Sequence, residues 1–300
     1  MARTGGAPER TPVTGNPVTM PFDTRAEIDP CSLTGPAAFE PHGTATMPGR
    51  PDMDNCRVSV ATDAGRAFVW LGEQMSTSML PRDRTQLADL GRGATIVLLE
   101  DGCDMALVLA EGFAVTAFST SADDGDLPEV LLCSLNRGAL TGVFNVLAGE
   151  RAKLWRPAPN SLATLSPCDV MSRGLVAEQL DIPSDVEPVF PITGHWCRWG
   201  EDDGNQATLR YPVAESASEL GVPDGHPTEV IADRESWVVA GRISCTVYAK
   251  HIDFAIGVGT FEFAELGVTM PDVGKPGAGD PCAAARTLAD AAWRHLPPVT

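Results

Sequence analysis

The chain has 300 residues, a length that favours two domains of roughly 100–150 residues each. It carries 40 acidic and 22 basic side chains, so its formal net charge at pH 7 is −18. Both halves are acidic, because residues 28–150 hold 17 acidic and 7 basic side chains and residues 151–300 hold 20 and 12. Such a surface repels nucleic-acid backbones and anionic lipid headgroups, and we expect neither as a partner.

The first 27 residues differ in composition from the rest of the chain. They are rich in Gly, Pro and Thr and hold three acidic and three basic side chains. They also lack an apolar core as long as a signal peptide or a membrane span requires. We therefore expect residues 1–27 to form a disordered arm. We also expect no direct membrane span in this chain, and an export signal that is absent from this sequence.

The eight cysteines form two sets with similar spacing, which indicates an internal repeat. Their separations are 25, 47 and 30 positions in the first set and 29, 48 and 37 in the second. The flanking residues agree in two places, Pro30-Cys31 with Pro167-Cys168 and Cys56-Arg57 with Cys197-Arg198. We expect one domain over residues 28–150 and a similar one over 165–300. Residues 151–164, which contain prolines and polar side chains, are expected to link them.

The predicted elements follow the same order in both domains. A short helix is expected after each Pro-Cys pair, over Leu33–Glu40 and Val170–Leu180, and a longer helix near each C-terminal end, over Cys133–Ala148 and Cys282–Leu296. Runs of β-forming residues between them predict antiparallel strands. In the first domain these are Arg57–Ala61, Ala67–Leu71, Ala94–Leu99, Asp104–Ala110 and Phe113–Phe118; in the second they are Ala207–Tyr211, Trp237–Ala240, Ser244–Ala249 and Phe254–Gly259.

The predicted fold class is therefore α+β. Each of the two similar domains is an antiparallel sheet packed by an N-terminal short helix and a C-terminal helix, and each holds two disulfides.

The cysteines are predicted to form disulfides. No Cys-x-x-Cys pair is present, which argues against zinc. Four cysteines in a domain allow three connectivities. We favour first-to-second and third-to-fourth pairing, because each bridge then ties a helix start to a nearby strand: Cys31–Cys56, Cys103–Cys133, Cys168–Cys197 and Cys245–Cys282. Such a bridge stabilises its domain by about 3–4 kcal/mol in the chain-entropy model, and it implies an oxidising compartment.

Three motifs resemble a known family. They are the Asp-Pro-Cys-Ser-Leu start at Asp29–Leu33, the cysteine on the following strand, and the closing helix that begins at Asp280-Pro281-Cys282 and runs to Leu296-Pro297. In order and repetition they resemble the actinobacterial lipoproteins called domain of unknown function 3558, in two tandem copies. The resemblance implies an exported protein of the cell envelope and attaches no enzymatic activity to it.

The sequence offers few motifs for catalysis. It lacks the Gly-x-Ser-x-Gly, His-Glu-x-x-His, P-loop and Ser-x-x-Lys patterns. The five histidines are scattered, at positions 42, 195, 226, 251 and 295. A catalytic triad assembled only in space stays open as an alternative. We predict no enzyme, no cofactor and no metal site.

The mixture His195-Trp196-Cys197-Arg198-Trp199 is the strongest candidate for binding. On a strand Cys197 and Trp199 share one face and Trp196 and Arg198 the other. The favoured interpretation is a disulfide packed on a core tryptophan, with His195, Trp196 and Arg198 as the candidate binding surface. If only one domain binds, we expect the second.

Three further features have simpler explanations. The acidic segments 123–126 and 201–204 are expected to be solvated turns and not calcium loops, and Gly91-Arg92-Gly93 a turn and not a nucleotide-binding loop. The apolar stretch Phe254–Met270 is expected to fill the core of the second domain, although Phe254, Phe261 and Phe263 could line a pocket for a lipid.

The leading hypothesis is a non-catalytic, extracytoplasmic binding or structural protein of the cell envelope, whose partner is another envelope protein. The alternative is a carrier of a small apolar or lipid ligand. An unrecognised enzyme ranks third.

Overall fold

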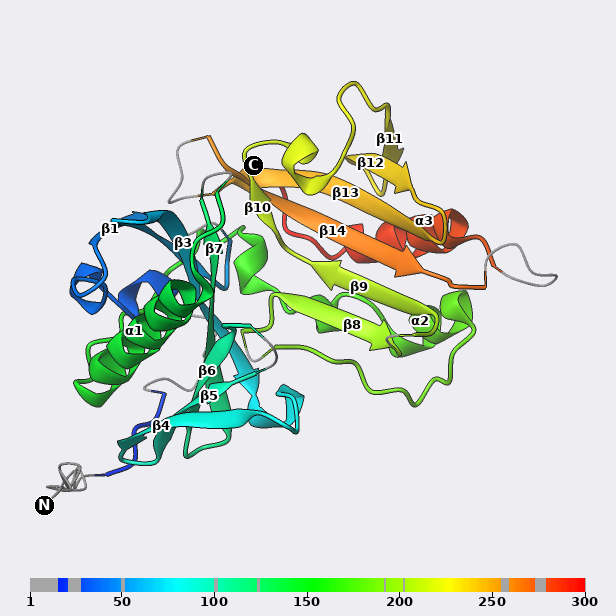
Figure 1. The fold of residues 1–300 in the computed structure, drawn as a ribbon. Helices are drawn as coiled ribbons and strands as arrows, with labels where there is room; N and C mark the ends of the chain where they lie inside the picture. Colours follow the sequence, from blue (N-terminus) through cyan, green and yellow to red (C-terminus); the bar gives the residue numbers. More distant parts are fainter. Residues whose placement is uncertain are drawn as a thin grey trace, which may run out of the picture.

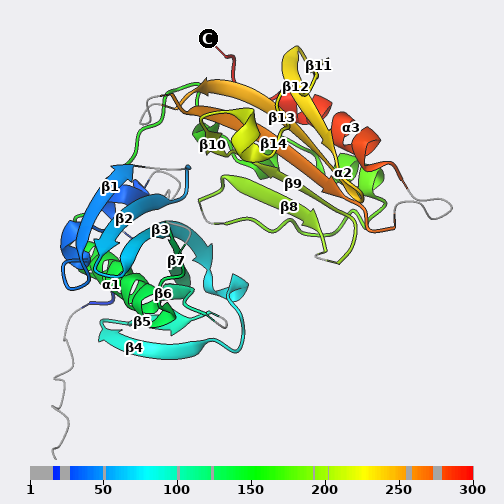
Figure 2. The ribbon, with the colours of Figure 1, turned by 45° about the horizontal axis from the view of Figure 1, so that its top comes forward.

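The computed structural model describes residues 16–20, 28–49, 52–99, 102–122, 125–191, 193–201, 203–254, 259–272 and 279–299. These residues form two α+β units that lie side by side (Figures 1 and 2). Each unit is built on its own antiparallel sheet of seven strands. We call them the first unit and the second unit.

The first unit contains one sheet and one long helix. Its strand order is β1-β2-β3-β7-β6-β5-β4. The strands are β1 (Thr44–Gly49), β2 (Cys56–Thr62), β3 (Gly65–Ser76), β4 (Thr85–Gly91), β5 (Ala94–Leu98), β6 (Met105–Leu109) and β7 (Phe113–Ser121). Helix α1 (Glu129–Ala148) covers one face of this sheet, and the second unit lies on the other side of it (Figure 1).

Alternation along the strands explains where the core of the first unit sits. In β2, Cys56, Val58 and Val60 are buried, while the residues between them are only partly buried. The buried side chains pack with those on the sheet-facing side of α1, among them Leu135, Ala139, Leu140 and Val143. Their spacing of three or four residues places them on one face of the helix. The core thus lies between α1 and the sheet.

The second unit repeats this plan. Its strands are β8 (Trp196–Gly200), β9 (Gln206–Arg210), β10 (Val213–Ala214), β11 (Thr228–Ile231), β12 (Arg234–Ala240), β13 (Ser244–Asp253) and β14 (Phe261–Thr269). Two helices, α2 (Arg173–Leu180) and α3 (Pro281–Trp293), pack against each other, and α3 packs on the sheet. Helix α3 begins where the Asp280 carboxylate accepts a hydrogen bond from the Cys282 amide and Pro281 fills the first turn.

The strand orders of the two sheets match. In the second sheet the order is β11-β12-β13-β14-β9-β8, with β10 paired to β14. When the cysteine-bearing strands β2 and β8 are equated, this is the order β4-β5-β6-β7-β3-β2 of the first sheet. The spacing of the cysteines therefore reflects one strand topology used twice.

The predicted disulfides are present as four close cysteine pairs, Cys31–Cys56, Cys103–Cys133, Cys168–Cys197 and Cys245–Cys282. Their Cα–Cα distances of 4.6 to 5.3 Å suit a disulfide. Each pair joins a helix or helical turn to the sheet, as expected. Disulfides of this kind are typical of proteins in an oxidising environment.

Several predicted elements have different bounds. The helix expected over Leu33–Glu40 consists instead of two 3-10 turns, Pro30–Ser32 and Pro36–Ala38. Gly35 is extended and Pro36 follows it, and the residue before a proline disfavours the helical region. The strand predicted over Phe254–Gly259 is wrong at its start, because β13 ends at Asp253. Residues 255–258 lie outside the described residues.

Two segments expected to be irregular are partly packed. In the N-terminal arm, Val18 and Met20 are buried in the core of the first unit, and the Val18 amide donates to the Arg92 carbonyl. The prediction of disorder is therefore wrong for residues 16–20, and residues 1–15 and 21–27 lie outside the described part. In the expected linker, Trp155 and Leu162 are buried in the core of the second unit.

Helix α1 alone among the described helices has the length and composition that would allow a membrane span. The helix has 20 residues, and an 18-residue window of it has a mean hydropathy of 1.4. A core helix of a soluble protein passes the same criteria, and one face of α1 packs on the sheet. The predicted absence of a span stays a prediction.

The disulfides can be tested by removing one. Replacing Cys245 and Cys282 together by serine opens a loop of 37 residues and should lower the free energy of unfolding of the second unit by about 3–4 kcal/mol. Urea unfolding of the oxidised protein, followed by tryptophan fluorescence, measures the loss. An unchanged midpoint would show that this bridge does not stabilise the unit.

Candidate functional site

The predicted binding residues lie in the contact between the two units. The faces of β8 are as predicted, since Cys197 and Trp199 are buried and Trp196 and Arg198 only partly so. His195 precedes the strand and is 3% exposed. It was expected on a binding surface but does not lie on an open one. The Trp196 indole Nε1 lies 3.4 Å from Glu73 Oε1 of the first unit. The outer face of β8 therefore meets the first unit.

A short loop of the first unit forms the other side of this contact. His195 Nδ1 and Asp54 Oδ1 are 2.6 Å apart, and the side chains are 2% and 13% exposed. The Asp52 carboxylate accepts hydrogen bonds from the amides of Asp54 and Asn55, at 2.8 and 2.6 Å, and so shapes the loop. Met53, at its tip, is 2% exposed and belongs to the hydrophobic core of the second unit. The loop 52–55 thus contacts the second unit in two ways, through the buried Met53 side chain and through the pair of Asp54 with His195.

Burial raises the pKa of two carboxyl groups beside this loop. The pKa of Glu73 is raised mainly by loss of hydration and then by the charge of Asp54, and the Trp196 hydrogen bond opposes the shift. Burial and the Asp54 charge likewise raise the pKa of Asp52, against the hydrogen bonds from the loop. The contact therefore favours protonated carboxyl groups.

A third buried carboxylate holds the segment that connects the units. Glu262 of β14 accepts hydrogen bonds from Ser161 Oγ at 2.6 Å and from the Leu162 amide at 2.7 Å. Burial raises the pKa of Glu262, while these hydrogen bonds and His195 lower it. The connecting segment is thereby fastened to the second sheet.

The chemistry available at the inter-unit contact is limited. His195 Nε2 is buried and has no hydrogen-bond partner among the described residues. Because the residue is only 3% exposed, a substrate in solution does not reach its ring. Within the described ranges, the one group of side chains spaced closely enough for a metal is Cys103, Glu129 and Cys133. Both of those cysteines are in a disulfide and offer no thiolate. The contact is best explained as a structural joint.

The other histidines are separate from this joint. His251 lies between the Asn160 carbonyl and the Arg234 guanidinium, and burial lowers its pKa. His226 is 2.8 Å from the Val238 carbonyl through Nε2. His295 follows α3, and His42 lies in the first unit between the 3-10 turn Pro36–Ala38 and β1.

The three phenylalanines proposed as a pocket lining differ in their surroundings. Phe254 and Phe263 are buried in the second unit, where Phe254 packs edge-on against Trp155 and Phe263 contacts Trp237. Phe261 is covered by the Lys250 ammonium, 3.0 Å from its ring centroid. Two of the three therefore serve packing, which was the favoured interpretation.

The glycine-containing segment and the acidic segments behave as turns where they are described. Gly91-Arg92-Gly93 connects β4 to β5 with positive φ angles, as expected of a tight turn. The Gly204 amide donates to the Glu201 carbonyl at 3.1 Å. Asp123, Asp124 and Asp202 lie outside the described residues.

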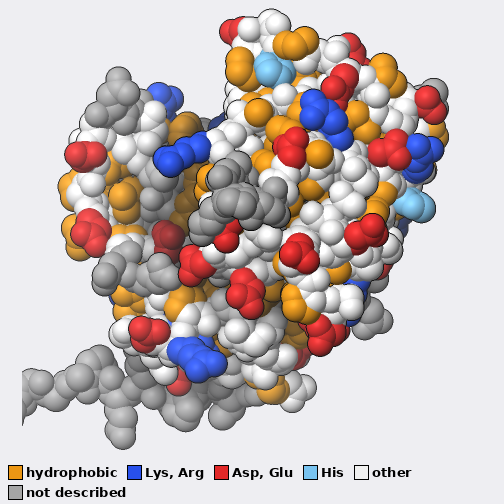
Figure 3. Space-filling view, turned by 90° about the vertical axis from the view of Figure 1, so that its right-hand side faces the viewer, with side chains coloured by type: hydrophobic (Ala, Val, Ile, Leu, Met, Phe, Trp, Pro, Cys, Tyr) orange, Lys and Arg blue, Asp and Glu red, His pale blue; other side chains and the backbone are white. Residues whose placement is uncertain are grey.

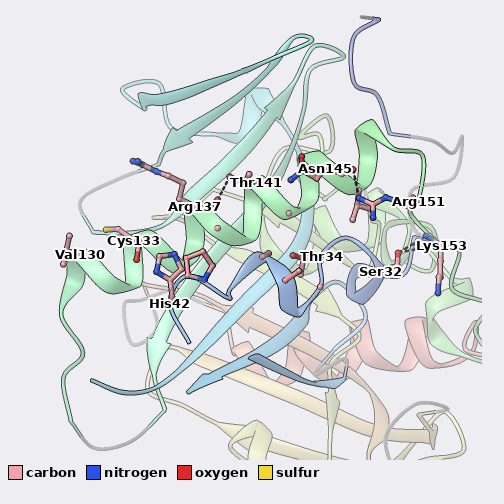
Figure 4. A pocket seen from close by; sticks show the side chains of 18 residues that line it. Ser32, Thr34, His42, Val130, Cys133, Arg137, Thr141, Asn145, Arg151 and Lys153 are labelled. Carbon is pink, nitrogen blue, oxygen red and sulfur yellow. Dashed lines mark hydrogen bonds between the residues drawn. The ribbon is translucent and has the colours of Figure 1, made fainter. Parts of the chain in front are cut away.

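A groove that no motif predicted runs along the outer face of α1. It lies between the helix and residues 32–42, has a volume of about 950 Å³ and is open to solvent (Figure 4). The helix contributes a stripe of mostly small and polar residues that recurs every three or four positions: Val130, Ser134, Gly138, Thr141, Gly142 and Asn145. This stripe lies opposite the residues that pack on the sheet.

Two glycines allow the second wall to approach the helix. A Cβ atom on Gly142 would lie 2.4 Å from Thr34 Oγ1, and one on Gly138 would lie 2.9 Å from the Ala38 carbonyl oxygen. Larger residues at these positions would push the 3-10 turns away from α1. The absence of side chains at the two glycines therefore allows the close contact between α1 and the second wall at the base of the groove.

The charged side chains that line the groove are basic. They are Arg137, Arg151 and Lys153, with His42 beside them, and the lining contains no Asp or Glu. The Arg151 guanidinium donates to the Asn145 carbonyl at 2.9 Å, and the Lys153 amide donates to Ser32 Oγ at 2.8 Å. These bonds position two of the cations at one end of the groove, in a protein that is acidic as a whole.

The comparisons with known proteins identify no family. No family model matches the chain, and no curated protein matches it. One solved structure, the di-domain ARO/CYC StfQ from the steffimycin biosynthetic pathway, aligns over 88% of this chain and 85% of its own at 10% identity, with a TM-score of 0.16. That score is too low to support an argument about fold or function.

The partly buried charge of Glu73 should make the stability of the joint depend on pH. A carboxyl group whose pKa is raised by folding contributes stability below its unfolded value of 4.5, and this is lost as the pH rises through the folded value. Glu73→Gln keeps the acceptor for Trp196 without the charge. It should raise the free energy of unfolding at pH 7 and leave it nearly unchanged at pH 4.

Thermal unfolding at both values of pH measures this difference. Glu178→Gln, on the exposed face of α2, is the matched control and should have little effect at either pH. Equal effects of Glu73→Gln at pH 4 and pH 7 would contradict the assignment.

The apolar contact can be tested at Met53. Met53→Ala should lower the free energy of unfolding by about 2–4 kcal/mol, because it leaves a cavity in the core of the second unit. Met79→Ala, at a partly buried position outside that core, should lower it by clearly less. Urea unfolding compares them, and similar losses would mean that Met53 does not hold the units together.

Proposed function

We propose that the protein is a non-catalytic binding protein that works outside the cytoplasm and that its binding site is the groove along α1. The observation that carries this proposal is the groove itself, an open site on a helix whose opposite face is packed in the core. Its volume lies within the roughly 300–1,000 Å³ that is usual for ligand pockets.

Both walls of the groove are cross-linked to the sheet, which supports a preformed binding site. Cys133 in α1 is joined to Cys103, which precedes β6. Cys31, in the turn that leads to the second wall, is joined to Cys56 at the start of β2. A site held in shape before binding loses less conformational entropy when the ligand binds.

The groove also accounts for a division of labour between the units. In the second unit the eight-residue helix α2 packs against α3. In the first unit the corresponding neighbour of α1 is the 3-10 turn Pro36–Ala38 and not a helix. Helix α1 is also seven residues longer than α3. The outer face of α1 is therefore less covered. This supports a binding site in the first unit, whereas the sequence favoured the second.

The proposed location rests on two lines of support. The four disulfides are typical of secreted and envelope proteins. The resemblance to the lipoprotein family called domain of unknown function 3558 suggests the actinobacterial cell envelope, and another envelope protein as partner. The alternative function, a carrier of an apolar ligand, is less well supported because Phe254 and Phe263 are packed in the core.

Site-specific cross-linking tests the proposed site. A photo-reactive phenylalanine analogue is placed at Thr141, which lines the groove, or at Gln86, which is exposed on β4. In the envelope of an actinobacterium, irradiation should produce a discrete adduct from position 141 and not from position 86. The additional change Ser134→Trp should fill the groove and remove the adduct. Equal yields at both positions, or none at position 141, would refute the proposal.

A further inference from the structure

Taking the groove as the binding site, we propose that its occupant is an extended acidic segment of a partner protein, about seven residues long. This inference depends on the proposed function and adds the chemical class of the partner. Three features of the groove carry it: its charge, its hydrogen-bonding groups and its length.

The charge of the groove is opposite to that of the protein. The charged residues of its lining are Arg137, Arg151 and Lys153, although the chain has 40 acidic and 22 basic residues. All three cations are exposed, and none forms an ion pair with a described carboxylate. They are therefore available to acidic side chains, and an arginine can bind a carboxylate through two parallel hydrogen bonds.

The hydroxyl groups on α1 complement a peptide backbone. Ser134 Oγ donates to the Leu131 carbonyl at 2.7 Å, and Thr141 Oγ1 donates to the Arg137 carbonyl at 2.8 Å. Each hydroxyl proton is thus already donated to a carbonyl of the helix, and the hydroxyl oxygen can still accept a hydrogen bond from a ligand in the groove. A peptide supplies N–H donors for such acceptors, whereas the acyl chains of a lipid do not. This favours a peptide over an anionic lipid.

The length of the groove suits an extended chain. From Val130 to Val146 the helical stripe rises by about 24 Å at 1.5 Å per residue. An extended segment of about seven residues covers that distance at about 3.3 Å per residue.

The rest of the surface limits how such a partner can bind. Acidic side chains are spread over the face of the molecule shown in Figure 3, and the net charge is −18. We therefore expect the acidic surface to repel an acidic segment and the basic lining of the groove to attract it. Because the cations are exposed, salt screens the attraction, and binding should weaken as the ionic strength rises.

The test uses the full-length oxidised protein and three fluorescein-labelled heptapeptides, in which alanine alternates with glutamate, glutamine or lysine. Fluorescence anisotropy should show the glutamate peptide binding at least ten-fold more tightly than the other two. The double variant Arg137→Gln and Arg151→Gln should lose about ten-fold in affinity. Replacing the same two arginines by lysine should restore most of it, and Arg82→Gln, on an exposed residue outside the groove, should have no effect.

The outcomes separate this inference from the proposed function. Equal affinity for the glutamate and glutamine peptides, or no effect of the arginine variants, would overturn the acidic peptide. Vesicles containing an anionic phospholipid serve as a second probe. If the vesicles bind and the peptide does not, and if vesicle binding depends on the same arginines, the groove binds a lipid surface. That result would also overturn the inference. If peptide binding fails while the cross-link from position 141 persists, the groove still binds a partner of another chemistry.

Discussion

The structure depends most on the covalent attachment of each helical element to its sheet. In the first unit the bridge at Cys133 fastens α1, and the bridge at Cys31 fastens the turn that leads to the other wall of the groove. In the second unit the bridge at Cys282 fastens the first turn of α3 to β13. Because the same cross-links stabilise the fold and shape the groove, an oxidising environment is a condition for both.

The joint between the units shows how opposing interactions balance. Burial of the Met53 side chain in the core of the second unit stabilises the joint through the hydrophobic effect. Beside it, Asp54 and His195 satisfy each other's hydrogen-bonding capacity. Burial of Asp52 and Glu73 acts against this gain, since a desolvated carboxylate is costly. The loop is held at its exit by Cys56, so the covalent framework also orients the joint.

One topology has produced two different surfaces. Both sheets use the same strand order, and both carry a helix attached by the fourth cysteine. What differs is the segment that packs beside that helix: the extended Gly35 followed by Pro36 prevents a continuous helix in the first unit, and α2 occupies the equivalent segment in the second. A small local difference in backbone preference thus decides which unit retains an open groove.

The sequence by itself determined the alternation along β8 and indicated the α+β class, because period-two burial and the runs of helix-forming and strand-forming residues are local signals. It allowed three cysteine connectivities in each domain, and the one that we favoured is the one present in the structure. It also indicated that Trp199 belongs to the core. Only the tertiary structure decided that His195 is buried against Asp54, since these residues are 141 positions apart and no local pattern relates them. The groove was equally invisible, because Arg137, Arg151 and Lys153 look like ordinary surface charges until α1 and residues 32–42 pack together.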